Sequence, residues 1–297
     1  MVAKIMREPV SPETAQRIFD LRKDVWVGYE AALEVRYHLE QLLIHPDSNR
    51  MPCLALLGRS QNGKSSILAN FLKRNPPVSD PNAEKALMPV LLIDMPPAPI
   101  EGRLYYRILS KFGVAGSARE SDESMLHRIC ILLSHLETKM LIVDEAFNLN
   151  GGSHTQHQRM LNAIRGICTS LRIPVVIAGV PQVEPILARD ESIGNRFRPV
   201  YLPSWNDKRL EEYARFIKTF LKHFKLANQS NLMDENALMQ LLHFSDGLLG
   251  ETVKILTVLA EMAIRSGEEV IEPKHITKQH LDAAGYVPPA TGRSYNY

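Results

Sequence analysis

The sequence predicts an α/β fold in which a five-stranded parallel sheet is covered by helices and is followed by an all-helical domain. Three observations favour this fold. A glycine-containing loop at residues 58–65 lies between a short apolar run and an amphipathic helical stretch. Further apolar runs of strand length alternate with helical stretches up to residue 205, which is typical of a parallel sheet buried on both faces. From residue 206 onward the sequence has helical patterns and no convincing strand.

The loop fits the phosphate-binding pattern G-x-x-x-x-G-K-[ST], and the predicted strand 53–57 and helix 65–74 flank it as that motif requires. Its two glycines leave room for backbone N–H groups to point at phosphate oxygens. Lys64 is expected to reach the β- and γ-phosphates, and Ser65 to place its hydroxyl on Mg²⁺. We therefore expect ATP and Mg²⁺ as cofactors. The residues expected to contact the nucleotide are Gly58, Ser60, Gln61, Asn62, Gly63, Lys64, Ser65 and Ser66.

The predicted strand at residues 140–143 ends in two acids, Asp144 and Glu145. In a fold with a phosphate-binding loop, the first acid holds Mg²⁺, most often through water. The second polarises the water that attacks the γ-phosphate. Asp144 is therefore a candidate metal ligand and Glu145 a candidate catalytic base. Both would lie at the carboxyl ends of the strands, where ligands bind in such sheets.

The remaining strands are expected at residues 90–94, 173–179 and 200–202, and four helices follow at 210–224, 234–244, 251–266 and 274–284. We expect an N-terminal helical segment at 1–50, an ATPase core at 51–205, a helical lid domain at 206–285 and a flexible tail at 286–297.

The composition is that of a globular protein and does not by itself indicate a function. The 297 residues are 45% hydrophobic and 23% charged, as in ordinary globular proteins. The net charge of +2 means that nucleic-acid binding would depend on local patches. The three cysteines are widely spaced and form no C-x-x-C pair, which favours buried thiols in a reducing compartment. We see no signal-peptide pattern and no apolar run near the roughly 20 residues of a membrane span, so a cytoplasmic protein is expected.

A basic stripe is expected on the helix that begins near residue 101, because Arg103, Arg107 and Lys111 are spaced by four. Such a stripe is most often a solvated helix face, and DNA contact is the alternative.

Taken together, these features resemble an AAA+ ATPase, and the middle of the chain resembles the TniB family, which is related to TnsC. The motifs that carry this resemblance are Asp144-Glu145-Ala146-Phe147-Asn148-Leu149, Gly152-Ser153, Gln158-Arg159, residues 173–179, Asn195-Arg196-Phe197 and Leu202-Pro203-Ser204-Trp205. The resemblance implies an ATP-dependent ring or filament of the chain on double-stranded DNA. It also implies a regulator of DNA transposition that links a TniQ-type target selector to a DDE transposase, associated with the bacterial nucleoid when on DNA.

The resemblance also assigns roles to single residues. Arg196 matches the position from which the family supplies an arginine to the γ-phosphate of a neighbouring subunit, and Arg198 or Arg189 are alternatives. A plain exposed arginine at a strand edge is the competing interpretation. The basic stripe follows the second strand, where relatives contact DNA, so the resemblance favours its DNA role.

Two positions depart from the family pattern. Relatives carry Gly-Thr after the fourth strand, whereas this chain has Gly179-Val180, and valine cannot hydrogen-bond to a phosphate. Gln182 is a possible replacement. In the lid, an arginine often follows a glycine, but here Glu251 does, and Lys254 is the possible stand-in. These departures predict ATP binding with slow hydrolysis. A replication-type helicase loader and a nucleotide-switch scaffold without DNA remain alternative functions.

Overall fold

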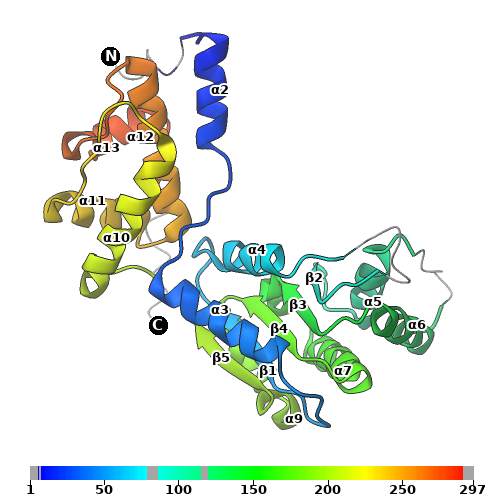
Figure 1. Cartoon of the computed structure of the whole chain (residues 1–297). Coiled ribbons are helices and arrows are strands. Elements are labelled where there is room, and N and C mark those ends of the chain that lie inside the picture. The colour runs from blue at the N-terminus through cyan, green and yellow to red at the C-terminus, as the bar shows by residue number, and fades with distance from the viewer. Residues whose placement is uncertain (1–5, 7, 79–85, 115–119, 290–297) are drawn as a thin grey trace. The chain divides into compact units, whose positions relative to one another are not determined.

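The computed structural model describes residues 6, 8–78, 86–114 and 120–289 (Figure 1). The predicted tail thus falls mostly outside the described residues. The chain divides into two compact units. The α/β unit comprises residues 31–60 and 64–202, and the helical unit comprises residues 1–30, 61–63 and 203–297. The expected N-terminal segment is therefore shared between the units, and the centre of the phosphate-binding loop groups with the helical unit.

The α/β unit confirms the predicted five-stranded sheet. Its strands are β1 (Cys53–Leu57), β2 (Val90–Asp94), β3 (Met140–Asp144), β4 (Val175–Gly179) and β5 (Phe197–Tyr201). They are all parallel and lie in the order β2-β3-β4-β1-β5. Strands β1, β3 and β4 are buried along their whole length, which explains their unbroken apolar sequences.

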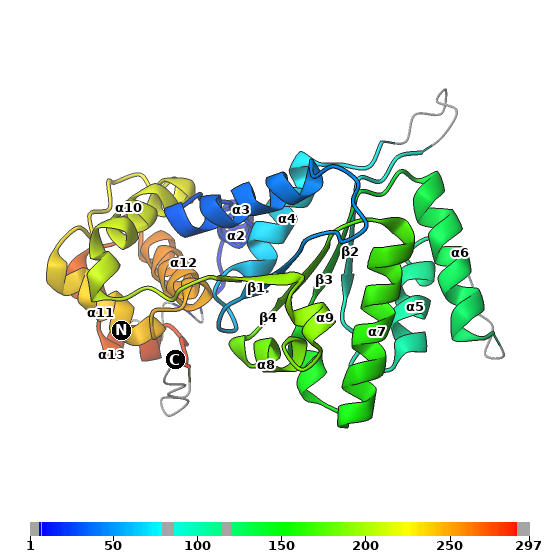
Figure 2. The same ribbon diagram turned by 90° about the horizontal axis from the view of Figure 1, so that it is seen from below.

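Helices cover both faces of this sheet, because right-handed crossovers place the β1–β2 connection on one face and the later connections on the other. Figure 2 shows α3 (Glu30–Leu43) and α4 (Lys64–Arg74) on one side and α7 (His154–Leu171) on the other. The apolar core on the α7 side includes the strand residues Cys53, Ala55 and Leu57. The other helices of the unit are α5 (Glu101–Ser110), α6 (Asp122–His135), α8 (Glu184–Leu187) and α9 (Glu191–Gly194).

Strand β5 begins earlier than the sequence predicts, at Phe197 instead of residue 200. Among the residues that the structure describes it is an edge strand that pairs only with β1, and Arg198 and Pro199 on it are exposed. An edge strand tolerates a proline and polar residues, because one of its sides needs no ladder hydrogen bonds. The apolar pattern therefore marked only its second half.

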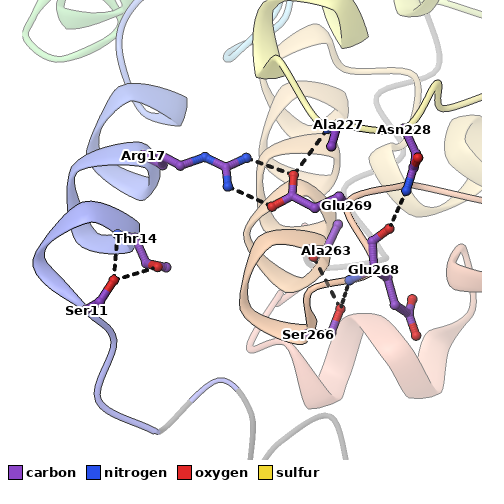
Figure 3. A network of polar contacts seen from close by, with 9 residues as sticks. All are labelled: Ser11, Thr14, Arg17, Ala227, Asn228, Ala263, Ser266, Glu268 and Glu269. Atoms are coloured by element: carbon purple, nitrogen blue, oxygen red, sulfur yellow. Dashed lines mark hydrogen bonds and ion pairs between the residues drawn. The ribbon is translucent and has the colours of Figure 1, made fainter.

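The helical unit contains α10 (Leu210–Leu221), α11 (Glu235–Ser245), α12 (Leu249–Ser266) and α13 (Lys278–Ala283). It also contains α2 (Pro12–Leu21), which the sequence reading did not place. Figure 3 shows how α2 is attached: Arg17 donates two hydrogen bonds, of 2.7 and 2.8 Å, to the Glu269 carboxylate just after α12. The N–H of Ala227 donates to the same carboxylate at 3.3 Å.

In the described residues, no helix is both long and apolar enough to cross a membrane.

Trp205, near the start of the last segment of the helical unit, is held by contacts within that unit. The N–H of Trp205 donates to the Gly247 carbonyl at 2.9 Å, and its indole packs against Tyr29, Tyr213 and Phe216. Gly247 has a φ of +64°, and a Cβ at this position would lie 2.2 Å from the Trp205 oxygen. Only glycine fits there, so Trp205 is held by the turn at Gly247, which lies far along the chain.

Candidate nucleotide site

The loop leaves strand β1 at Gly58, whose N–H donates to the Gly179 carbonyl of β4 at 3.0 Å. A Cβ on Gly58 would lie 3.0 Å from the Leu202 oxygen and 3.2 Å from the Leu202 Cβ. The N–H of Leu202 in turn donates to the Leu57 carbonyl at 2.7 Å, so the neighbouring backbone cannot easily retreat. The first motif glycine is therefore required by the close packing of β1 against the end of β5.

Lys64 folds back over the start of the loop. Its Nζ donates to the carbonyl oxygens of Gly58 and Arg59, each at 2.8 Å. Burial lowers the pKa of Lys64, while the charges of Asp144 and Glu145 act to raise it. The ammonium is thus held by weak neutral acceptors, and phosphate oxygens would be stronger acceptors for it.

Ser65 and Asp144 meet where the sequence predicts the metal. The Ser65 Oγ donates to Asp144 Oδ2 at 2.7 Å, and Asp144 Oδ1 accepts from the Glu145 N–H, also at 2.7 Å. Asp144 is 6% exposed and lies at the end of β3. A hydroxyl and a carboxylate in contact supply the hard oxygen donors that Mg²⁺ prefers.

Glu145 follows in a left-handed conformation with a φ of 56° and ψ of 34°. This backbone region is uncommon for a residue other than glycine and concentrates at functional sites. The Glu145 side chain is exposed. The short helix η1 (Ala146–Asn150) comes next, and Asn148 fixes it by donating to the Met95 carbonyl at 2.8 Å. Glu145 is therefore held on a tethered turn and is open to water.

Residues 61–63 of the loop contact the start of α12 within the helical unit. The N–H of Gly250 donates to the Gln61 carbonyl at 2.8 Å, and Gln61 has a φ of 60°. Gly63 has a φ of +89°, and a Cβ there would lie 2.6 Å from Leu249 Cδ2. Asn62 is buried at 2% exposure. Ser60 in the loop and Ser66 in α4, which belong to the α/β unit, are exposed.

Lys254 is tied to the same loop residue. Its Nζ donates to Gln61 Oε1 at 3.0 Å and to Glu251 Oε1 at 2.5 Å. Glu251 is only 3% exposed, and the hydroxyl of Tyr286 donates to its other oxygen at 3.0 Å. Glu251, which departs from the family pattern, is therefore an anchor for Lys254. The sequence predicts a role for Lys254 but not for Tyr286, because nothing local to residue 286 points to this contact.

Arg196 lies at the amino end of the sheet. It immediately precedes β5, and its carbonyl accepts from the Cys53 N–H at 2.9 Å. In the register of β1 with β5, Gly58 follows the other end of the strands, about 20 Å away along them. Arg196 thus cannot reach a nucleotide bound at the loop of its own α/β unit. Arg198 is exposed on β5, and Nη1 of Arg189 lies 3.2 Å from Nδ1 of His157.

The basic stripe lies on α5, whose inner face buries Leu104 and Ile108. Arg103 is exposed, as is Lys111, which is the residue that caps the end of the helix. Arg107 is partly engaged, since its Nη1 lies 3.8 Å from Asp94 Oδ2 at the end of β2. The three cations therefore stay on the outer surface of the α/β unit.

The residue that follows β4, Val180, is apolar and offers no hydrogen bond to a phosphate. Val180 packs partly buried against the core, and Gln182 follows in the short helix η2 (Pro181–Val183). Whether Gln182 replaces the missing threonine stays a prediction.

The fold is shared with origin-recognition proteins. The structure of the Aeropyrum pernix ORC1 protein in complex with DNA is similar with a TM-score of 0.60 and 14% identity, over 90% of this chain and 68% of that chain. The Aeropyrum pernix ORC2 protein, solved as ADPNP-ADP complexes, has a TM-score of 0.61 and 15% identity, over 88% and 70%. Drosophila ORC bound to DNA has a TM-score of 0.57 and 14% identity, over 92% and 67%. At these identities the likeness shows the AAA+ fold alone.

No curated protein matches the chain in sequence. The profile described as "Bacterial TniB protein" matches residues 17–207. This match spans the phosphate-binding loop, the Asp144-Glu145 pair, Arg196 and Trp205, and it covers well over half of the chain. The chain therefore belongs to the TniB family.

Proposed function

We propose that the chain is an ATP-binding regulator of DNA transposition that assembles on double-stranded DNA when ATP is bound. The observation that carries the proposal is the contact of Ser65 with Asp144 at 2.7 Å, beside the Lys64 ammonium on the same loop. This arrangement supports an ATPase of the AAA+ class, and membership in the TniB family supports the transposition role.

The residues at the end of β1 and β3 fit ATP and Mg²⁺. Ser65 and Asp144 offer oxygen donors in contact with each other, and the Lys64 ammonium is bonded only to neutral carbonyl oxygens of the loop. Bound Mg²⁺ would neutralise charge on the phosphate oxygens. Lys64 would give up its bonds to the two loop carbonyls and donate to phosphate. Glu145, exposed on its tethered turn, would orient a water molecule and accept its proton.

Arg196 supports assembly of several copies. Because it lies at the end of the sheet away from the loop, a role on nucleotide requires the loop of another copy. A guanidinium suits this role, since it remains charged and binds phosphate oxygens in a fixed two-pronged geometry. We therefore propose a ring or filament in which each joint contains ATP.

Hydrolysis is proposed to be slow. Val180 offers no hydrogen bond, and Lys254 is occupied by Glu251 and Gln61. In this proposal the chain uses ATP chiefly to assemble, and DNA-bound assemblies connect a TniQ-type target selector with a DDE transposase.

DNA contact is proposed for Arg103, Arg107 and Lys111 on α5. They would bind phosphates without sequence preference, and each lost phosphate contact lowers the salt slope of binding by about 0.9. Replacing both arginines, Arg103→Glu with Arg107→Glu, should weaken ATP-dependent DNA binding and flatten its salt dependence. The matched control is Lys73→Glu with Arg74→Glu on α4, which reverses two exposed charges elsewhere on the unit. Equal effects of the two pairs would remove α5 from the proposal.

The nucleotide site is tested by binding of a fluorescent ATP analogue. Lys64→Ala should abolish binding, whereas Glu145→Gln should keep binding and remove the slow hydrolysis. Retention of hydrolysis by Glu145→Gln would overturn the assignment of the base. Stimulation of transposase strand transfer, against loading of a replicative helicase, separates the transposition role from the helicase-loader alternative. Binding of ATP without any DNA-dependent assembly would favour the nucleotide-switch scaffold.

A further inference from the structure

Two of the three cysteines form a buried pair. Cys53 begins β1 and Cys168 lies in α7, on the same side of the sheet. Their sulfur atoms are 3.7 Å apart, and the residues are 2% and 3% exposed. Because they are 115 positions apart, the sequence offers no sign of this pairing. The third thiol, Cys130, lies on α6 and is half-buried.

Arg196 borders this pair. Its Nη1 lies 4.0 Å from Cys168 Sγ and 3.5 Å from Thr169 Oγ1, and its carbonyl accepts from the Cys53 N–H at 2.9 Å. Its Nε is buried without a hydrogen-bond partner among the residues that the structure describes. The guanidinium is thus turned back onto the sulfur of Cys168, at the amino end of the sheet.

The two thiols are chemically unequal. The hydrogen bond from Cys53 and the charge of Arg196 lower the pKa of Cys168 to about 7, against the opposing effect of burial. The same hydrogen bond and burial raise the pKa of Cys53. The thiolate is the reactive form of cysteine, so Cys168 would attack an oxidant and Cys53 would resolve the product.

We propose that Cys53 and Cys168 are an oxidation site at which a peroxide forms an intramolecular disulfide, and that the reduced pair holds Arg196 in place. The Cys168 thiolate attacks one peroxide oxygen, which gives a sulfenic acid and releases water after protonation. The Cys53 sulfur then attacks the sulfenic sulfur, which forms the S–S bond and releases a second water. Overall, two thiols and one hydrogen peroxide give one disulfide and two waters.

The disulfide would remove the acceptor that the Cys168 thiolate offers to Arg196. The consequence for assembly rests on the proposed function, in which Arg196 acts on the nucleotide of a neighbouring copy. The oxidation itself does not depend on that function. A chain that fails to bind ATP would still form the disulfide, so the two proposals can fail separately.

The test treats the reduced full-length chain with hydrogen peroxide and then alkylates the remaining thiols under denaturing conditions. We expect wild-type protein to lose two hydrogen atoms in intact mass and to keep one alkylatable thiol, Cys130, with a peptide that links Cys53 to Cys168. Cys130→Ser should form the same link and keep none. Three alkylatable thiols after peroxide treatment of the wild type would overturn the proposal.

Three further variants separate a reactive pair from incidental proximity. Cys53→Ser should leave Cys168 as a sulfenic acid that dimedone traps, with no disulfide. Arg196→Gln should slow oxidation about twofold to threefold at neutral pH, since less thiolate is present, whereas Arg196→Lys should restore the rate. Equal rates in Arg196→Gln and wild type would show that Arg196 does not influence the pair.

Discussion

Gly247 gives the sharpest test of the packing that holds the helical unit together. Its φ is +64°, and a Cβ would lie 2.2 Å from the Trp205 oxygen, far closer than any real contact. The left-handed backbone alone costs alanine about 1 kcal/mol. Displacing the Trp205 backbone and straining its hydrogen bond to Gly247 should add about 2–4 kcal/mol. Gly247→Ala should therefore cost about 3–5 kcal/mol of unfolding free energy.

Gly267 is the matched control. It ends α12 with a φ of +75°, and a Cβ there would meet nothing within 4 Å. Gly267→Ala should cost only the backbone term, about 1 kcal/mol. The measurement is denaturant unfolding followed by far-UV circular dichroism for both variants. A Gly247→Ala variant no less stable than Gly267→Ala would contradict the close packing of Gly247 against the Trp205 backbone.

Three further predictions concern the α2 contact, the loop and its tie to α12. Arg17 lowers the pKa of Glu269, so this carboxylate stabilises the fold above its ordinary pKa and loses that effect as pH falls through the lowered value. Because the Arg17 side chain is 40% exposed, Glu269→Gln should cost only about 0.5–1 kcal/mol at neutral pH, and the difference from wild type in thermal unfolding should vanish in acid. Gly58→Ala should weaken ATP binding at least about tenfold by titration, since the new Cβ meets the Leu202 backbone; unchanged affinity would contradict the close approach. Lys254→Met should weaken ATP binding about fivefold, because the phosphate-binding loop loses the charged, partly exposed hydrogen bond from Lys254 to Gln61. The control Lys222→Met, in the same unit, should leave ATP binding unchanged.

The fold was largely predictable because buried strands and helices leave recognisable apolar patterns in the sequence. Three strands buried along their length gave unbroken apolar runs, and the pattern at residues 58–65 fixed which strand carries the loop. Only the second half of strand β5 was predicted, since an edge strand bears exposed residues such as Arg198. Helix α2 was not predicted because the residues that hold it are far apart in the sequence: its ion pairs join Arg17 to Glu269 and Arg22 to Glu261, 252 and 239 positions apart.

The candidate site was predictable where its residues belong to local motifs. Lys64, Ser65, Asp144 and Glu145 were predicted from the loop motif and from the strands and helix that flank it, and the structure brings Ser65 into contact with Asp144. What the sequence could not supply are contacts between distant segments. The anchoring of Lys254 by Glu251 and Tyr286 and the pairing of Cys53 with Cys168 both arise only from the folded chain.

The position of Arg196 is the reason for proposing that several copies assemble. A cation at the amino end of the sheet, about 20 Å along the strands from Gly58, has no nucleotide to act on within its own unit. We therefore predict that assembly requires both ATP and Arg196, whereas ATP binding requires Lys64 and does not require Arg196.

The most direct measurement is electron microscopy of the full-length chain with duplex DNA and either a non-hydrolysable ATP analogue or ADP. We predict ordered rings or filaments on DNA with the ATP analogue, none with ADP, and loss of assembly in Arg196→Ala while ATP binding persists. Assemblies that form equally with ADP, or that persist in Arg196→Ala, would contradict it.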